Sequence, residues 1–411
     1  MALALRRELA RHLAASAALL ATACAPETGT APEIGIGARW EHVHPGAPHA
    51  ARIAGPALAV DRDGTAWLAW IRSADAERSV ELARRVGDAF EVVRVDPEGF
   101  APSSAHQAPG LAAGPDGRVH LTWSVEREDA GGSVFASDLV VRSATAAGSV
   151  ELGTPRRLNE DRPGSRGFEG IAVRADGALV AAWLEGGRTS RSRVAVVGPG
   201  GDRLVTTLDE QACPCCRFAL ASAADGRVGV LWRDELPGRV RDMVFAVAGT
   251  EGFSSPRSVR RDGWSLDACP HRGGALAFAP DGRALAVWYT EGDDSRPRLL
   301  AAWGGEGGFD DPLFVHEGEG SFPDRVALAI DAAGRGVVLW ERRTPVRSEI
   351  AARTLEGRSL GPVRVVSQGV KASEPQIVAR PSGGFLASWN EEAFPTLRTV
   401  VASLDPTPGS R

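Results

Sequence analysis

The stretch PALAVDRDGTAWLAW, residues 56–70, is the first of seven copies of one pattern: an apolar strand, a glycine turn and a second apolar strand ending in tryptophan. The later copies are GLAAGPDGRVHLTW (110–123), GIAVRADGALVAAW (170–183), FALASAADGRVGVLW (218–232), GALAFAPDGRALAVW (274–288), VALAIDAAGRGVVLW (326–340) and QIVARPSGGFLASW (376–389). The final tryptophans follow one another at intervals of 49 to 60 residues, which is typical of propeller blades. Because one apolar hairpin cannot bury both its faces but stacked hairpins can, the repeat predicts an all-β, seven-bladed β-propeller. Six blades plus an irregular segment is the alternative count.

The turns and the small residues indicate which strand of each copy lies nearest the propeller axis. Five turns contain Asp-Gly, as in Asp63-Gly64 and Asp281-Gly282. This dipeptide favours a type I′ hairpin, in which both central residues have positive φ. Alanine, glycine and valine crowd the first strand, as an inner strand near the axis requires, and the tryptophans are expected to fill the space between blades.

The last copy has only one strand after Trp389, TLRTVVASL, where a blade needs two. We expect the N-terminal segment ARWEHVH, residues 38–44, to supply the missing outer strand. Such closure joins the two chain ends in one blade and removes free sheet edges. The predicted propeller domain is residues 37–408.

The N-terminus predicts export. Arg6, Arg7 and Arg11 precede a short apolar run, so residues 1–23 are interpreted as a signal peptide. The run ends in Ala21-Thr22-Ala23-Cys24, which resembles a bacterial lipobox with Cys24 as the lipidated residue. Residues 24–36 would then be a linker, and the protein an outer-membrane or periplasmic lipoprotein that contacts the membrane only through its lipid. The alternative is an ordinary signal peptide cut near Ala23.

The amino-acid composition favours some classes of binding partner over others. The chain has 48 glycines and 27 prolines, which favours a turn-rich β protein over a helical one. Its net charge of -5 and the lack of a basic stripe argue against nucleic-acid binding. We expect a monomer whose ligand is an anionic small molecule or a glycan.

Propeller topology places the Asp-Gly turns on one face and the more varied loops on the other. The loops on this second face lead into the inner strands or leave the tryptophan strands, and polar residues that converge there are the default site of a ligand. The candidate ligand-binding residues are Arg52, His106, Glu169, Arg217, Arg233, Asp234, Arg272 and Arg325. The alternative is that such loop residues are polar only because they are solvated or brace one another.

Four cysteines lie before two consecutive inner strands, Cys213, Cys215 and Cys216 in one copy and Cys269 in the next. Their matching positions predict that they are close in space. In an exported protein an even number favours two disulfides, whose pairing the sequence leaves open. A soft-metal site for copper or zinc that includes His271, or a thiol-redox module, is the alternative.

The first copy resembles the bacterial sialidase (neuraminidase) family. The shared features are Arg52-Ile53-Ala54-Gly55-Pro56, the arginine after Trp70, an acid at Asp75, and glycine-rich turns such as GGEGGF that look like eroded Asp-boxes of BNR repeats. The resemblance implies an arginine cluster that binds a carboxylate, with Asp75 as the acid and Tyr289, the one tyrosine in the chain, as nucleophile. It departs from the family because two residues interrupt the Arg-Ile-Pro motif and no intact Asp-box remains. An exo-sialidase-type glycoside hydrolase is therefore kept as the alternative to a binding protein.

The run Cys213-Pro214-Cys215-Cys216, the Arg233-Asp234 pair after a blade tryptophan and the Cys269-Pro270 of the next copy also resemble a bacterial sialidase-like group within this superfamily. That similarity covers the fourth and fifth copies and implies no particular activity.

Overall fold

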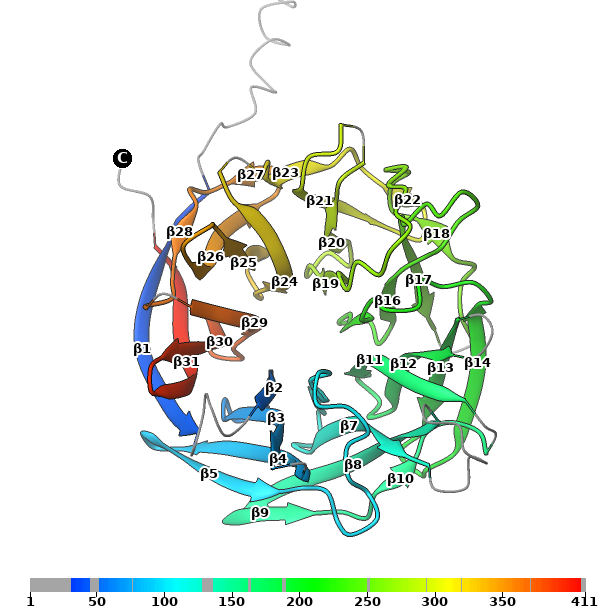
Figure 1. Cartoon of the computed structure of the whole chain (residues 1–411), viewed down its shortest axis with the longest axis vertical. Coiled ribbons are helices and arrows are strands. Elements are labelled where there is room, and N and C mark those ends of the chain that lie inside the picture. Colours follow the sequence, from blue (N-terminus) through cyan, green and yellow to red (C-terminus); the bar gives the residue numbers. More distant parts are fainter. Residues whose placement is uncertain are drawn as a thin grey trace, which may run out of the picture.

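The computed structural model describes residues 31–44, 52–75, 77–127, 136–161, 164–186, 190–249, 252–292, 294–318, 320–369 and 371–407. Every regular element within these ranges is a β-strand. Antiparallel sheets are arranged in a ring around a central opening (Figure 1), so the predicted all-β, propeller-like fold is confirmed. The described part of the chain has no helix that is long and apolar enough to cross a membrane.

The first four sheets follow the chain in order, and each begins with its innermost strand. They contain β2 (Arg52–Val60), β3 (Ala66–Ala74), β4 (Glu77–Val86) and β5 (Ala89–Arg94); β6 (Gly110–Ala113), β7 (Val119–Glu126), β8 (Ser137–Ala147), β9 (Ser149–Leu152) and β10 (Arg156–Arg157); β11 (Ser165–Val173), β12 (Leu179–Gly186), β13 (Arg191–Val197) and β14 (Arg203–Asp209); and β15 (Ala219–Ser222), β16 (Val228–Arg233), β17 (Met243–Ala248) and β18 (Arg257–Ser258).

The remaining strands form one five-stranded and one nine-stranded sheet. The former contains β19 (Gly274–Phe278), β20 (Ala284–Thr290), β21 (Arg298–Gly305), β22 (Gly308–Phe309) and β23 (Leu313–His316). The latter contains β24 (Phe322–Ile330), β25 (Arg335–Arg343), β26 (Ser348–Glu356), β27 (Ser359–Leu360), β28 (Arg364–Val365), β29 (Lys371–Ala379), β30 (Phe385–Ala393), β31 (Thr396–Thr407) and β1 (Glu33–His44). A single parallel pairing of Ser348 with Lys371 joins its β24–β28 part to its β29–β31–β1 part.

The chain ends close the ring as expected. Strand β1 pairs antiparallel with β31, Trp40 lying opposite Val401, and the two strands run side by side in Figure 1. The Arg39 guanidinium also reaches the Glu391 carboxylate of β30, with an Nη2–Oε2 distance of 2.7 Å. The N-terminal strand therefore covers an edge that β31 would otherwise expose to other chains.

The repeated tryptophans pack between consecutive sheets. Trp183 shares an apolar cluster with Leu139 of the preceding sheet, and Trp288 shares one with Leu231. The seven tryptophans that end the second strands are at most 1% exposed. Burying an aromatic side chain of this size removes 150–250 Å2 from water, so these residues supply much of the attraction between blades.

The Asp-Gly turns differ from the prediction. Only the glycine of each turn has positive φ, for example Gly64 at 83°, and the preceding aspartate does not. The Gly64 N–H donates to the Asp61 carbonyl oxygen at 3.0 Å, and the Asp61 N–H donates to Thr65. The turn is therefore a type I turn followed by a left-handed glycine, and the type I′ prediction was wrong.

Candidate functional site

Two cavities open on the face opposite the Asp-Gly turns. The first is a central channel of about 280 Å3 at the start of the inner strands, and its lining includes Arg217, His271, Arg272, Arg325 and Glu374. Three of the predicted arginines are thus brought together at one opening. Arg52 does not line this channel.

Bulges at the start of the inner strands aim these side chains toward the axis. The register shifts between Asp324 and Val326 of β24, and between Ser373 and Gln376 of β29. Within these shifts Arg325 and Glu374 adopt positive φ, at 32° and 59°. Such a conformation is uncommon for residues other than glycine, and it is typically kept where a side chain must be redirected.

The channel arginines have partners in the structure. Arg217 donates to the carbonyl oxygens of Glu169 and Pro109, both at 2.9 Å. Arg325 bonds the Glu374 carboxylate at 2.9 Å. Arg272 lies 3.5 Å from the Asp324 carboxylate, and its guanidinium sits 4.5 Å from the centre of the Tyr289 ring.

The half-buried Glu374 and the buried Glu169 balance the positive charge. Burial raises the pKa of Glu374 even though Arg325 acts against this shift. Burial also raises the pKa of Glu169, which is 2% exposed, and here Arg217 opposes the shift. The channel is therefore a region of paired charges in which both acids bind a proton more readily than they would in water.

The second cavity is a larger cleft of about 1140 Å3 beside the channel. About half of its lining is polar, and hydroxyl, amide and charged groups come from Ser103, Gln107, Glu126, Ser165, Arg166, Ser190, Gln211, Glu235 and Arg239. None of the eight candidate ligand-binding residues lines this cleft. Its walls come from the loops before β6, β11 and β15, from the end of β7 and the start of β8, and from the loops that follow β12 and β16.

The two cavities share their walls. Gln107 lines the cleft whereas Pro109 lines the channel, and Phe168 and Gly170 are divided in the same way. The loop that holds the three clustered cysteines lies between them, because Pro214 borders the cleft and Arg217 the channel.

The other predicted ligand-binding residues lie elsewhere. Arg52 and His106 are exposed and contact each other, with 2.7 Å between Nη1 and Nδ1. Arg233 is 1% exposed and donates to the carbonyl oxygens of Arg272, Arg241 and Tyr289. Burial, and then the neighbouring Asp209 carboxyl, raise the pKa of Asp234 to about 7.

Neither residue of the catalytic pair implied by the sialidase resemblance lines either cavity. Tyr289 is 2% exposed, lines neither cavity and donates its phenolic hydrogen to Glu291. Burial, together with Glu291, holds the pKa of this phenol far above its usual value, so the hydroxyl stays protonated. Asp75 is exposed at the end of β3, with φ of 49°.

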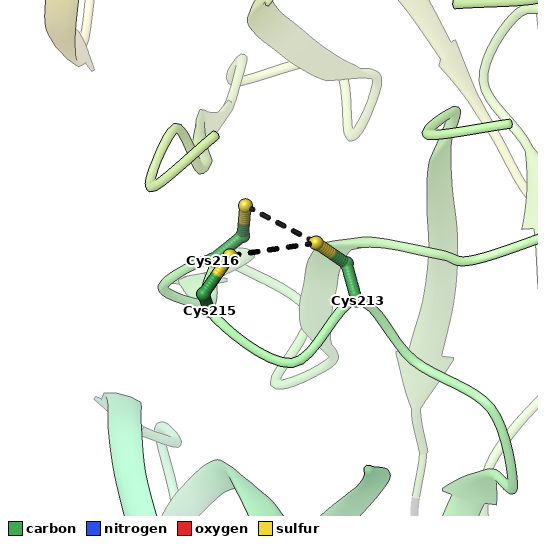
Figure 2. Close-up of side chains that lie close together, drawn as sticks. All are labelled: Cys213, Cys215 and Cys216. Carbon is green, nitrogen blue, oxygen red and sulfur yellow. Dashed lines mark hydrogen bonds between the residues drawn. The ribbon is translucent and has the colours of Figure 1, made fainter. Parts of the chain in front are cut away.

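The cysteines gather as their positions predicted. The Cys213 sulfur lies 3.9 Å from that of Cys215 and 3.5 Å from that of Cys216, and all three are buried (Figure 2). All four described cysteines, Cys269 included, are free thiols, so neither predicted disulfide is formed. Hydrogen bonds from Cys213 and Cys215 hold the pKa of Cys216 well below its usual range. Cys24 lies outside the described residues.

Comparison with solved structures supports the fold. The chain is similar to the polysaccharide lyase Uly1 (10% identity, 94% of each chain, TM-score 0.56) and to a PL25 ulvan lyase bound to -[GlcA(1-4)Rha3S]- (9% identity, 88% of this chain and 92% of that one, TM-score 0.52). It is also similar to a Dyadobacter fermentans protein of unknown function (13% identity, 92% and 100%, TM-score 0.53). Identities this low establish a shared fold only.

Sialidases also match more distantly, among them one from Trypanosoma rangeli in complex with the inhibitor DANA, at 11% identity, TM-score 0.47 and coverage of 91% of this chain and 60% of that one. No family model and no curated protein matches the chain.

Proposed function

We propose that this propeller binds a segment of an acidic polysaccharide on the face that carries the two cavities. The observation that supports this most directly is the cleft of about 1140 Å3, which shares its loops with the arginine-lined channel. Typical small-ligand pockets measure about 300–1,000 Å3, so the cleft has room for more than one sugar ring.

The chemistry of the two cavities suits different parts of such a ligand. Serine, glutamine and glutamate side chains in the cleft can exchange hydrogen bonds with sugar hydroxyls. An acidic substituent reaching the channel would compete with Glu374 for Arg325 and with Asp324 for Arg272. Because burial raises the pKa of Glu374, this acid takes up a proton at a higher pH than an exposed glutamate does, and its protonation releases Arg325 for the ligand.

The fold neighbours give the choice of probe. Two of them are described as polysaccharide lyases, and the ligand of one is a glucuronate–rhamnose-3-sulfate repeat. We therefore expect the purified protein to bind oligosaccharides of this repeat more tightly than neutral dextran oligosaccharides in a calorimetric titration. Ultraviolet absorbance of an unsaturated uronate, recorded on the same samples, distinguishes binding from cleavage.

Matched variants test whether the polysaccharide binds in the cleft and the channel. Gln211→Ala in the cleft and Arg325→Ala in the channel should each weaken binding about tenfold, which corresponds to roughly 1.4 kcal/mol. Arg118→Ala changes an exposed arginine beside an Asp-Gly turn and should leave affinity unchanged. The proposal fails if no acidic oligosaccharide binds, or if all three variants bind as the parent does.

We also propose that the nine-stranded sheet counts as two blades, which gives seven around the ring. One bridge between Ser348 and Lys371 is all that merges its two parts, and each part begins with its own inner strand, β24 or β29. An experimental structure with six equivalent blades would contradict this count.

The proposed location is the cell envelope, through lipidation at Cys24. The support is the sequence of residues 1–24 alone. Metabolic labelling with a palmitate analogue should mark the parent protein and not Cys24→Ala. Equal labelling of both, or of neither, would exclude this anchor.

A further inference from the structure

The cysteine cluster has an arrangement that its sequence spacing does not suggest. Five soft or borderline donors form two sets of three, and in each set the ligand atoms lie within 4.8 Å of one another. Cys213, Cys215 and Cys216 form the inner triad, which is fully buried. Cys215, Cys269 and His271 form the outer triad, in which Cys269 and His271 are exposed.

We propose that the inner triad binds one copper(I) ion through three thiolates, and that the outer triad delivers the ion to it. The inner triad is separate from the polysaccharide proposal, because its three cysteines line neither cavity; of the five donors only His271 lines the channel.

Sulfur spacing supports a three-coordinate ion. A metal about 2.3 Å from each of three sulfurs in one plane spaces the sulfurs about 4.0 Å apart. The Cys213 sulfur already lies 3.9 Å and 3.5 Å from the other two (Figure 2). All three sulfurs lie within 4.8 Å of one another, so shifts of less than about 1 Å would let them surround an ion.

The number of donors favours copper(I) over zinc. Structural zinc sites are almost always tetrahedral with four protein ligands, whereas no set of four such donors comes together among the described residues. Thiolates are soft ligands that bind both copper(I) and zinc, so it is the count of three donors, rather than their softness, that favours copper(I) here.

The surrounding charge also fits a monovalent ion. Three thiolates and copper(I) carry a net charge of -2, which a buried site must offset. The positive charges of Arg233 and Arg241 both act on this cluster, Arg233 on Cys216 and Arg241 on Cys213 and Cys215. Both guanidinium groups are themselves buried, at 1% and 3% exposure, so their charges are little screened by water. Arg241 also pairs with the Glu235 carboxylate at 2.5 Å, so Arg233 supplies the larger part of the offset.

The outer triad provides a route into the buried site. His271 lines the central channel, and Cys269 is exposed beside it. Because Cys215 belongs to both triads, an ion held by the outer set can move inward while it keeps the Cys215 sulfur as a ligand. No change in the oxidation state of the ion is needed for this transfer.

The test is an anaerobic titration of the reduced full-length protein with copper(I) held by the chelator bathocuproine disulfonate. We expect the protein to withdraw one equivalent of copper from the chelator, with a new thiolate-to-copper absorption band. Loss of a residue that only supports a metal ligand costs 10–100-fold in affinity, so Cys213→Ser or Cys216→Ser, which remove a ligand itself, should cost at least about 100-fold.

The outer variants serve as matched controls. Cys269→Ser and His271→Ala should keep one equivalent at nearly the parent affinity but load about tenfold more slowly. Thermal midpoints of all four variants show whether each has folded, and the measurement on the parent protein stands even if a cysteine variant does not.

Four results would overturn the proposal. The first is that the reduced protein leaves copper(I) with the chelator, and the second is that it binds zinc(II) as tightly as copper(I). The third is that Cys213→Ser and Cys216→Ser bind copper(I) as the parent does. The fourth is that the inner cysteines of native protein isolated without reductant are already joined in disulfides.

Discussion

Replacing Arg233 with methionine should destabilise the protein markedly while leaving the ring of blades intact. Arg233 is the last residue of β16, and its side chain donates to three backbone carbonyl oxygens, those of Arg272 at 3.0 Å, Tyr289 at 2.7 Å and Arg241. Its guanidinium also lies 4.8 Å from the centre of the Trp264 ring. One side chain thus connects the loop before β19, the end of β20 and the loop before β17.

The expected loss follows from the three acceptors. A buried carbonyl oxygen left without its donor costs about 1–3 kcal/mol, and the lower half of that range for three of them gives about 4 kcal/mol. Methionine keeps most of the apolar volume, so no large cavity adds to this figure. The unfolding entropy is ~2.1 cal/mol/K per residue over roughly 380 residues, and dividing the free-energy loss by this entropy gives a fall of about 5 °C in the thermal unfolding midpoint.

Circular dichroism during heating measures this shift, with Arg118→Met as the control on the exposed Asp-Gly face. Surface substitutions of that kind usually change stability by less than about 0.5 kcal/mol, so the control should stay within about 1 °C. Arg233→Lys retains the charge and one donor group, and it should recover part of the loss. A fall of less than about 1 °C in Arg233→Met would refute the reasoning, because the three carbonyls would then be satisfied without this side chain.

Three further outcomes are expected. The raised pKa of Asp234, about 7, means that the folded protein binds this proton more tightly than the unfolded chain does, so the free energy of unfolding falls as pH rises from about 4 to about 7. Asp234→Asn should remove this decline and raise the thermal midpoint at pH 8. An unaltered dependence of stability on pH in this variant would contradict the assignment to Asp234. Deleting residues 31–44 exposes the edge of β31, so the shortened protein should elute as oligomers in size-exclusion chromatography, whereas an unchanged monomer peak would show that β1 is dispensable. Tyr289→Phe removes only a buried hydroxyl that bonds Glu291, so polysaccharide affinity should not change. Neither the parent protein nor this variant should hydrolyse a fluorogenic sialoside. Hydrolysis by the parent that is lost in the variant would restore the glycosidase hypothesis.

The repeat was readable from the sequence because its physical causes are local and occur many times. A tryptophan at the end of each second strand has to be buried, and the only apolar partner available to it is the neighbouring blade, as Trp183 and Trp288 show. The closure by residues 38–44 followed from counting strands. The turn type was wrong because Asp-Gly is compatible with two hairpin geometries, and the longer loop of Asp61–Thr65 selects the one with a single left-handed residue.

The nearness of the cysteines was also predictable, since equivalent positions in consecutive blades meet at the axis. What the sequence could not reveal was their division into two triads that share Cys215, because this depends on how the backbone turns between Cys213 and Cys216. A run of three cysteines in four residues looks too compressed for one ion. In the structure the Cys213 sulfur nevertheless faces the sulfurs of both Cys215 and Cys216 (Figure 2).

The pairing of the channel arginines with acids could not be predicted from the sequence. An arginine cluster at the start of the inner strands suggested a strongly positive site, yet Arg325 meets Glu374 there, and Arg217 lies beside the buried Glu169. Both acids lie in bulges at the start of inner strands, in which Phe168 and Glu374 have positive φ, and neither residue type signals that conformation. A ligand in this channel must therefore displace an internal carboxylate or arrive when that carboxylate is protonated. Selectivity at such a site depends on the pKa of the acid at least as much as on the number of arginines.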